Sequence, residues 1–388
     1  MAGKFIPLSV PNLKGRELEY VTHAVETEWV STAGPYVNEF ENKLAAYVGA
    51  PGAVSCQNGT AGLHIALLLC GVKPGDLVLV PTVTFIAAVN PVRYLGAEPV
   101  FIDCDGSLCM DPLKLERFCR EECRVQNGAL YHKASGKRVP ALAVVHVFGN
   151  MADMETIMRV AGEFHLKVVE DATEALGTKY ITGTYAGRFA GTMGTMGVYS
   201  FNGNKIITTG GGGMIVSQDT GLLQKAKHLT TQAKADPENF IHDEIGYNYR
   251  LTNLQAALGL AQLEQLETFI AVKHRNYELY REKLSAVPGL SILEFREGIR
   301  SNYWFYSLYV QASYPKKPAE LMAYLKKRGI QTRPIWGLIH EQLPYQGSMA
   351  YEIERSVDYW KHVVNLPCST NLTEEDVEQV AAAIREAE

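Results

Sequence analysis

The chain has 388 residues, of which 47% are hydrophobic and 20% are charged. This composition is that of a folded globular protein and excludes a disordered chain. The formal charge of −5 at pH 7 argues against nucleic acid as a partner. The longest apolar run, residues 63–72, is interrupted by His64 and is too short to cross a membrane.

The cysteines and the first residues bear on the compartment of the protein. The seven cysteines include no pair with the Cys-x-x-Cys spacing of a zinc site, so we expect reduced thiols and no bound metal. Residues 1–7 lack the apolar core of a signal peptide. We therefore expect a cytoplasmic protein with no membrane partner.

Short apolar runs alternate with longer helical stretches over the first two-thirds of the chain. Each run is continuous rather than alternating, which is typical of strands covered on both faces. The order predicts an α/β fold with a mostly parallel sheet, whose ligands bind beyond the carboxyl ends of the strands. Strands are expected at residues 53–56, 77–80, 99–103, 141–146 and 166–171, and helices at residues 60–69 and 154–164.

One segment interrupts this order. Residues 121–139 carry Asn127-Gly128 among alternating polar residues, and they separate a helix from the next core strand. An Asn-Gly pair between short alternating runs is a strong signal for a hairpin turn. We expect an inserted surface hairpin, for which the sequence indicates no function.

The pattern changes near Thr252. Apolar positions from there to Ile270 predict one long helix, and a smaller α+β region follows. Its expected elements are a strand at residues 304–310 and helices at residues 319–327 and 374–385, the last capped by Thr373. The chain thus divides into a large α/β domain over residues 1–255 and a smaller C-terminal domain over residues 256–388.

Lys205 carries the clearest chemical signal. It lies in the segment SFNGNKIITT, which four glycines follow, and Glu170-Asp171 ends an apolar run 34 residues upstream. A lysine that forms a Schiff base with pyridoxal phosphate needs small residues around a flat ring, and the ring nitrogen needs a carboxylate. Asp171 suits that role, although a carboxylate at a strand end can also bind a metal or cap a helix.

Residues 58–62 offer a place for a phosphate group. They follow the strand at residues 53–56 and open a helix, so the backbone amides of Thr60 and Ala61, with the Thr60 hydroxyl, are expected to form a phosphate cup beside Gly59. Ser200 offers a further hydroxyl. Alone this signal is weak, because a Gly-Thr pair at a helix start is often only a cap.

These segments together resemble the sugar aminotransferases of the DegT/DnrJ/EryC1/StrS family. The similarity runs nearly from end to end, and ordered matching segments are far more specific than any single one. The segments are WVSTAGP (29–35), NGTA (58–61), PTVTF (81–85), HVFGN (146–150), EDATEA (170–175), SFNGNK (200–205) and GYNYR (246–250). The resemblance implies fold type I of the pyridoxal phosphate-dependent transferases, like aspartate aminotransferase.

The resemblance also implies roles for individual residues. Lys205 is the Schiff-base lysine and proton carrier, Asp171 lies on the pyridine nitrogen, and Phe85 stacks on the ring, although plain core packing would also explain a phenylalanine there. The phosphate is held by Thr60, Ala61 and Ser200 together with Asn248 of a neighbouring subunit. That last role implies a homodimer with shared active sites.

One position departs from the family pattern. Many relatives carry glutamine three residues after the aspartate, whereas this chain has Glu174. A glutamine amide can donate a hydrogen bond to the cofactor, and an ionised glutamate cannot. Glu174 therefore either stays protonated or contacts the sugar or a water, and its role stays open.

Three further residues are candidates for binding substrate. Arg250 and Arg333 suit the substrate diphosphate or the carboxylate of the amino donor, and a structural salt bridge is the alternative for each. His340 can line the pocket, as can His146, but a lone histidine is often structural.

The resemblance implies transfer of an amino group from L-glutamate to a UDP-linked 4-keto-6-deoxy sugar. Within the family the chain is most similar to enzymes that aminate UDP-2-acetamido-4-keto-2,6-dideoxyglucose in bacillosamine and legionaminic acid pathways. One alternative is a sugar dehydratase on the same scaffold, but those relatives have histidine at the position of Lys205. Another is a non-catalytic binding or regulatory protein of this fold. The ring carbon that is aminated and its stereochemistry stay open.

Overall fold

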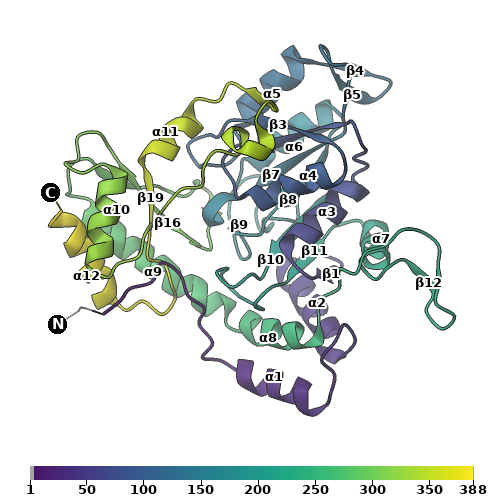
Figure 1. Ribbon diagram of the computed structural model, residues 1–388, viewed down its shortest axis with the longest axis horizontal. Coiled ribbons are helices and arrows are strands. Elements are labelled where there is room, and N and C mark those ends of the chain that lie inside the picture. Colours follow the sequence, from purple (N-terminus) through teal and green to yellow (C-terminus); the bar gives the residue numbers. More distant parts are fainter. Residues whose placement is uncertain (1–3, 388) are drawn as a thin grey trace.

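The computed structural model describes residues 4–387. Within these residues, eight strands form one large sheet in the order β1-β11-β10-β8-β7-β2-β3-β18 (Figure 1). Neighbouring strands are parallel except for β11, which runs antiparallel to both β1 and β10. The strands are β1 (Ala53–Cys56), β2 (Leu77–Pro81), β3 (Glu98–Ile102), β7 (Ala141–Val145), β8 (Lys167–Asp171), β10 (Met196–Ser200), β11 (Gly213–Val216) and β18 (Met349–Tyr351). The mostly parallel sheet that the sequence predicts is confirmed.

Apolar side chains cover the large sheet on both faces. Successive residues of a strand point to opposite faces, and in β2 Leu77 and Leu79 belong to one buried cluster while Val78 and Val80 belong to another. All residues of β2 and β7 are buried, which explains their continuous apolar sequences. The helices of this part are α1 (Glu17–Glu26), α2 (Pro35–Val48), α3 (Gly59–Leu69), α4 (Asn90–Tyr94), α5 (Pro112–Glu121), α6 (Met154–Glu163) and α7 (Thr220–Thr230).

The strand ends bring distant parts of the sequence to one edge of the sheet. β8 ends at Asp171, β10 ends at Ser200, β2 leads toward Phe85, and β1 leads through Asn58 into α3. These four strands run in the same direction, because β1 and β10 are both antiparallel to β11. Their carboxyl ends therefore face the same region, as expected for a ligand site of an α/β sheet.

The insertion at residues 121–139 forms the expected hairpin and one further strand. β4 (Cys123–Gln126) pairs antiparallel with β5 (Ala129–His132), and β6 (Arg138–Val139) pairs with the other side of β5. Asn127 and Gly128 have φ angles of 53° and 71°. A two-residue hairpin turn requires such left-handed geometry, so the prediction from the Asn-Gly pair is confirmed.

The prediction of one long helix after Thr252 is wrong. The chain forms α8 (Asn253–Leu263) and then α9 (Leu266–Leu284), with Thr252 and Gln255 as a capping box at the start of α8. α8 packs against α1 and α2, whereas α9 packs against α12. The apolar residues of α8 and those of α9 thus pack against different helices, although they form one continuous pattern in the sequence.

The last part of the described chain forms a second, smaller layer with its own antiparallel sheet, in the order β14-β16-β19-β17 (Figure 1). The expected strand at residues 304–310 begins only at Tyr306, and Thr373 caps the final helix as predicted. The elements are β14 (Leu290–Ile292), β16 (Tyr306–Val310), β17 (Arg333–Pro334), β19 (Val363–Leu366), α10 (Pro318–Lys327), α11 (Arg355–His362) and α12 (Glu374–Arg385).

The C-terminal part also contributes to the large sheet. β18 pairs in parallel with β3 at the edge of that sheet. Asp103, directly after β3, accepts hydrogen bonds from the backbone amides of Glu354, Arg355 and Ser356, each at 2.9 Å. The division between residues 255 and 256 stays a prediction, and these contacts tie its two sides together.

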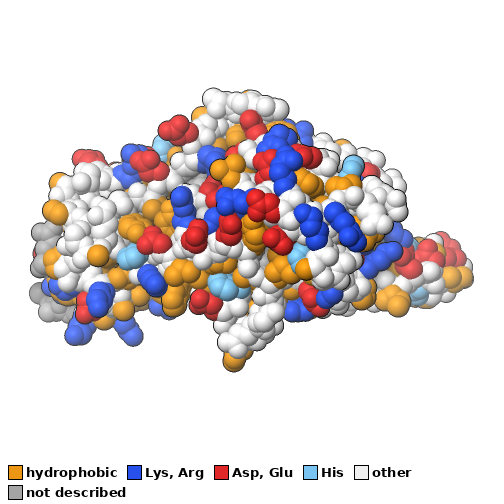
Figure 2. Space-filling view, turned by 90° about the horizontal axis from the view of Figure 1, so that it is seen from above, with side chains coloured by type: hydrophobic (Ala, Val, Ile, Leu, Met, Phe, Trp, Pro, Cys, Tyr) orange, Lys and Arg blue, Asp and Glu red, His pale blue; other side chains and the backbone are white. Residues whose placement is uncertain are grey.

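Charged side chains of both signs lie on the face of the molecule that Figure 2 shows. There, Lys and Arg side chains are interspersed with Asp and Glu side chains. Within residues 4–387, no helix has the length and apolar character needed to cross a membrane.

Candidate active site

A cavity of about 330 Å³ lies at the carboxyl edge of the large sheet. The sequence-predicted residues that line it are Gly59, Thr60, Phe85, Asp171, Glu174, Ser200 and Lys205. Residues from the strand ends and from the second layer complete it: Asn58, Leu63, Thr84, Ala87, Ala88, Thr173, Asn202, Asn204, Trp304 and Trp336. The cavity therefore joins segments from most of the length of the chain.

Lys205 extends into this cavity from a tight loop after β10. Its backbone amide donates to Asn202 O at 3.0 Å, and Phe201 N donates to Gly212 O at 2.9 Å, which closes the loop. Gly212 has a φ of 141°, and a Cβ there would lie 2.3 Å from Thr209 Oγ1, so only glycine fits. The Lys205 side chain is 13% exposed.

The amine of Lys205 has two close partners. Its Nζ lies 3.5 Å from Glu174 Oε1 and 4.1 Å from the centre of the Trp304 indole ring. Trp304 is held in turn by its Nε1, which donates to Asn204 O at 2.8 Å. The Lys205 amine is thus held between a carboxylate and an aromatic face.

Glu174 is buried, and its second oxygen is also engaged. Oε2 accepts a hydrogen bond from Phe148 N at 2.9 Å. Burial raises the pKa of Glu174 to about 7, while the charge of Lys205 and the bond from Phe148 act against that rise. Near neutral pH the carboxyl is therefore available in both its ionised and its protonated form.

Asp171 and Glu170 face opposite sides of β8. Asp171 lines the cavity and accepts a hydrogen bond from Thr173 N at 3.0 Å. Burial raises the pKa of Asp171, and the bonds from Thr173 and the charge of Lys205 oppose that shift. A cation in the cavity would therefore stabilise its ionised form.

Glu170, in contrast, is used by the protein itself. Its carboxylate accepts hydrogen bonds from the amides of Gly191 at 2.8 Å and Met193 at 2.6 Å, and also from Gly194. His146 Nε2 lies 2.9 Å from the same carboxylate and is fully buried. Both residues thus have structural partners, the alternative expected for a lone histidine.

The phosphate cup differs from the prediction at one residue. Asn58 caps α3, and its side chain accepts a hydrogen bond from Ala61 N at 2.8 Å. The expectation of a free amide at Ala61 is therefore wrong, because the cap uses it. The amides of Gly59 and Thr60 have no partner in the part of the chain that the structure describes, and they lie at the positive end of the helix.

Gly59 allows three segments to meet at this cup. A Cβ on Gly59 would lie 2.9 Å from Thr173 Cγ2 and 3.0 Å from Ser200 Cβ. The start of α3 thus approaches the ends of β8 and β10 as closely as a glycine permits. This contact places the amide donors next to the hydroxyl of Ser200.

The other sequence-predicted residues do not line the cavity of the described chain. Arg250 forms a buried ion pair with Glu41, with Nη1 3.1 Å from Oε1, which matches the structural alternative. Arg333 is exposed in β17, and Asn248 is exposed as well. His340 Nδ1 lies 2.6 Å from Thr82 Oγ1, and burial lowers the pKa of His340.

Sequence reasoning missed the two tryptophans that line the cavity. Trp304 precedes β16 and was predicted to be part of that strand. The Trp336 ring lies 4.5 Å from the ring of Phe148. The chain has only four tryptophans. Their rarity was the one available signal, because large aromatic side chains are frequent in binding sites.

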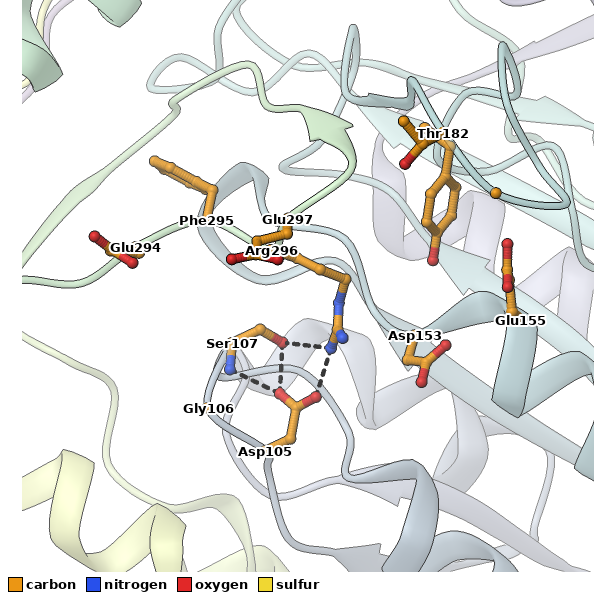
Figure 3. Close-up of a pocket in the computed structure, with 12 residues that line it drawn as sticks. Asp105, Gly106, Ser107, Asp153, Glu155, Thr182, Glu294, Phe295, Arg296 and Glu297 are labelled. Atoms are coloured by element: carbon orange, nitrogen blue, oxygen red, sulfur yellow. Dashed lines mark hydrogen bonds and ion pairs between the residues drawn. The ribbon is translucent and has the colours of Figure 1, made fainter.

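A second hollow, of about 590 Å³, lies between the loop after β3, the start of α6 and residues 294–297 (Figure 3). Two of its charged groups, Arg296 and Asp105, are already paired: Arg296 Nη2 lies 2.5 Å from Asp105 Oδ2 and 3.2 Å from Ser107 Oγ. None of the sequence-predicted residues is among the described residues that line it. The cavity around Lys205 is therefore the better candidate for chemistry.

The residues around Lys205 fit pyridoxal phosphate. The set comprises a lysine amine, a buried carboxyl whose ionised form gains from a neighbouring cation, and two amides at a helix start that have no partner within residues 4–387. These match the aldehyde, the ring nitrogen and the phosphate of that cofactor. Phe85 is 55% exposed at the rim, so its ring is free to cover a ligand.

Comparisons with known proteins agree with this chemistry. The model of the DegT/DnrJ/EryC1/StrS aminotransferase family matches residues 11–385. The chain is 35% identical to GDP-perosamine synthase of Escherichia coli O157:H7 over 383 residues, which cover 99% of this chain and 98% of that protein. It is 36% identical to EpsN of Bacillus subtilis (strain 168) over 379 residues, which cover 96% and 93%.

Solved structures of aminotransferases share the fold. The aminotransferase TlmJ from Streptoalloteichus hindustanus matches with a TM-score of 0.87 and 28% identity, covering 99% of each chain. A DegT DnrJ EryC1 StrS aminotransferase from Brucella abortus matches with a TM-score of 0.86 and 28% identity, covering 96% of this chain and 95% of that one. The chain therefore belongs to the DegT/DnrJ/EryC1/StrS family and is a pyridoxal phosphate-dependent sugar aminotransferase.

Proposed function

We propose that this protein transfers an amino group from L-glutamate to UDP-2-acetamido-2,6-dideoxy-hexos-4-ulose, giving the UDP-linked 4-amino-4,6-dideoxy-N-acetyl sugar. The observation that carries the proposal is the position of the Lys205 amine in the same cavity as the Asp171 carboxyl and residues Gly59 and Thr60 at the start of α3. Bound pyridoxal phosphate supplies an aldehyde that binds amines and a ring that accepts electrons. The residues of the chain supply binding, orientation and proton transfer.

In this proposal Lys205 binds the cofactor and later moves a proton to and from the carbon that carries the amino group. Asp171 holds the ring nitrogen in its protonated form. The amides of Gly59 and Thr60, with the hydroxyl of Ser200, bind the phosphate. Phe85 covers the ring at the rim of the cavity, where it limits access of water.

We also propose a homodimer with shared active sites. The hairpin of β12 (Lys234–Asp236) and β13 (Ile241–His242) projects from the body of the protein (Figure 1). Beside it Phe240 is 74% exposed and Ile245 is 86% exposed. Large exposed apolar side chains such as these favour burial in an interface with another chain. A second copy seated there would bring Asn248 to the phosphate of the partner site.

The UDP-linked 4-keto sugar rests on the resemblance to enzymes of bacillosamine and legionaminic acid pathways. The name of the relative GDP-perosamine synthase adds a GDP-linked sugar as the competing substrate. The test is therefore a panel of UDP-, GDP- and dTDP-linked 3- and 4-keto sugars with glutamate as donor. Product mass separates amination from loss of a hydroxyl, which would indicate a dehydratase.

Lys205→Ala is expected to abolish amination, with less than about 1% of wild-type turnover left, because general acid–base work alone contributes about 10²–10⁴ in rate. Lys326→Ala removes an exposed lysine of α10 and serves as the matched control. More than a few per cent of wild-type turnover in K205A would remove Lys205 from the mechanism. Amination of only the GDP-linked sugars would overturn the proposed substrate.

A further inference from the structure

The contact between Glu174 and Lys205 is not explained by the roles proposed above for the residues of the active site. The Glu174 carboxylate is fixed at both oxygens: Oε2 accepts from Phe148 N at 2.9 Å, and Oε1 lies 3.5 Å from Lys205 Nζ. The carboxylate therefore cannot rotate without losing the bond from Phe148. It is held with one oxygen aimed at the amine.

The groups that face Glu174 make Lys205 its one cationic partner among the described side chains around it. Asp171 lines the same cavity; when ionised it repels Glu174 and also attracts Lys205. Phe148 and Asn302 contact Glu174 only through neutral hydrogen bonds, the latter to its backbone oxygen at 2.9 Å. Lys205 in turn forms its ion pair with Glu174 while packing on the Trp304 ring.

We propose that Glu174 is the counter-ion of the Lys205 amine and fixes the pH range in which that amine is free to react. The inference rests on the proposed function, in which Lys205 is the residue that binds pyridoxal phosphate. Glu174 acts through Lys205 and is a positioning residue. An amine attacks an aldehyde only in its neutral form, and an ionised carboxylate at this distance stabilises the charged form.

Both partners of this ion pair are largely shielded from water. The Lys205 side chain is 13% exposed and that of Glu174 is 4% exposed, so water screens the pair poorly. The pKa of Glu174, raised to about 7 by burial, supports the geometry, because the carboxylate gains its charge within the range where an enzyme of this kind works. A glutamine would keep the hydrogen bond from Phe148 N but would carry no charge.

The test measures how fast the apoprotein captures added pyridoxal 5′-phosphate, followed by the absorbance of the bound cofactor between pH 6 and 10. The capture rate rises with pH as the amine loses its proton. In Glu174→Gln the midpoint of this rise is expected at least about one pH unit lower than in wild type. Below both midpoints, the variant is expected to capture the cofactor at least about tenfold faster.

Glu155→Gln is the matched control. Glu155 also accepts a hydrogen bond from a backbone amide, that of Thr184 at 2.6 Å, but it lines the other hollow. Its substitution should leave the midpoint unchanged. Equal midpoints in E174Q and wild type would overturn the proposal, because a purely structural role would move affinity or stability but not the pH profile.

Glu174→Asp gives a second route should E174Q fail to fold. Aspartate keeps the charge but is shorter by one methylene, so its midpoint should fall below that of wild type and above the value expected for E174Q. A midpoint at or above that of wild type would contradict the proposal. Failure of the proposed function gives different results. If the apoprotein captures the cofactor but aminates no sugar, only the proposed function is refuted. If K205A captures the cofactor as wild type does, both the proposed function and the counter-ion role of Glu174 are refuted.

Discussion

Replacement of Gly59 by alanine tests the contact between α3 and the ends of β8 and β10. The added Cβ would lie 2.9 Å from Thr173 Cγ2 and 3.0 Å from Ser200 Cβ, which is closer than packed carbon atoms approach. Thr173 can rotate its side chain away. Ser200 Cβ is fixed to the backbone, so the start of α3 must move, and overpacking of this kind costs about 1–3 kcal/mol.

We expect G59A to bind pyridoxal phosphate more weakly, because the amides of Gly59 and Thr60 move with the helix. If the full strain appears in binding, about 1–3 kcal/mol raises the dissociation constant about 5- to 150-fold. Absorbance titration of the apoprotein with the cofactor measures this change. Thermal unfolding of the apoprotein measures any strain that stays in the folded state.

Gly162→Ala is the matched control, because Gly162 also lies in a helix but a Cβ there meets nothing within 4 Å. G162A should bind the cofactor as wild type does and gain up to about 1 kcal/mol of stability from the helix preference of alanine. If G59A shows the wild-type affinity and the wild-type unfolding temperature, the start of α3 is free to move away from β8 and β10.

Three further substitutions probe the charged groups. Asp171→Asn should lower turnover by at least about 100-fold, since a neutral amide cannot keep a ring nitrogen protonated. Steady-state rates at saturating substrate measure this loss. A loss of only about tenfold would contradict the role of Asp171. Burial raises the pKa of Glu174 from 4.5 to about 7, so between these pH values the folded apoprotein retains a proton that the unfolded chain loses. Up to about 3 kcal/mol of stability that is present below pH 4.5 is therefore lost as the pH rises to 7. Urea unfolding at several pH values should show this decline in wild type and not in E174Q. Arg250→Met should cost about 1.5–3 kcal/mol of stability, the value of a hydrogen bond to a charged group, because Glu41 keeps Lys227 and Ser55 as partners. The loss should be smaller in combination with Glu41→Gln. Unchanged stability with weaker sugar-nucleotide binding would instead assign Arg250 to the substrate.

Much of the large sheet could be predicted from sequence because burial on both faces leaves a direct trace. The residues of β2 and β7 are all buried, and their apolar runs were found within one residue of the observed ends. The break between α8 and α9 left no such trace. The apolar positions continue across Glu264 and Gln265, and only the different packing partners of the two helices separate them.

The site was predictable where a residue type carries its chemistry alone. Lys205 does so, and the cavity contains it together with Asp171, which gained its meaning from Lys205, and Glu174, whose role stayed open. Arg250 does not, because its partner Glu41 lies 209 residues away in the sequence and no local pattern joins them. The capping of Ala61 N by Asn58 was readable in principle, since asparagine is among the preferred residues at a helix start.

The pairing of β18 with β3 sets an order for assembly of the fold. β3 is synthesised early, but its outer neighbour is Met349–Tyr351, near the end of the chain. Contacts so far apart in sequence form slowly, and an edge without its partner invites pairing with other molecules. In a nascent chain, the outer edge of β3 therefore stays unpaired until Met349–Tyr351 has been synthesised.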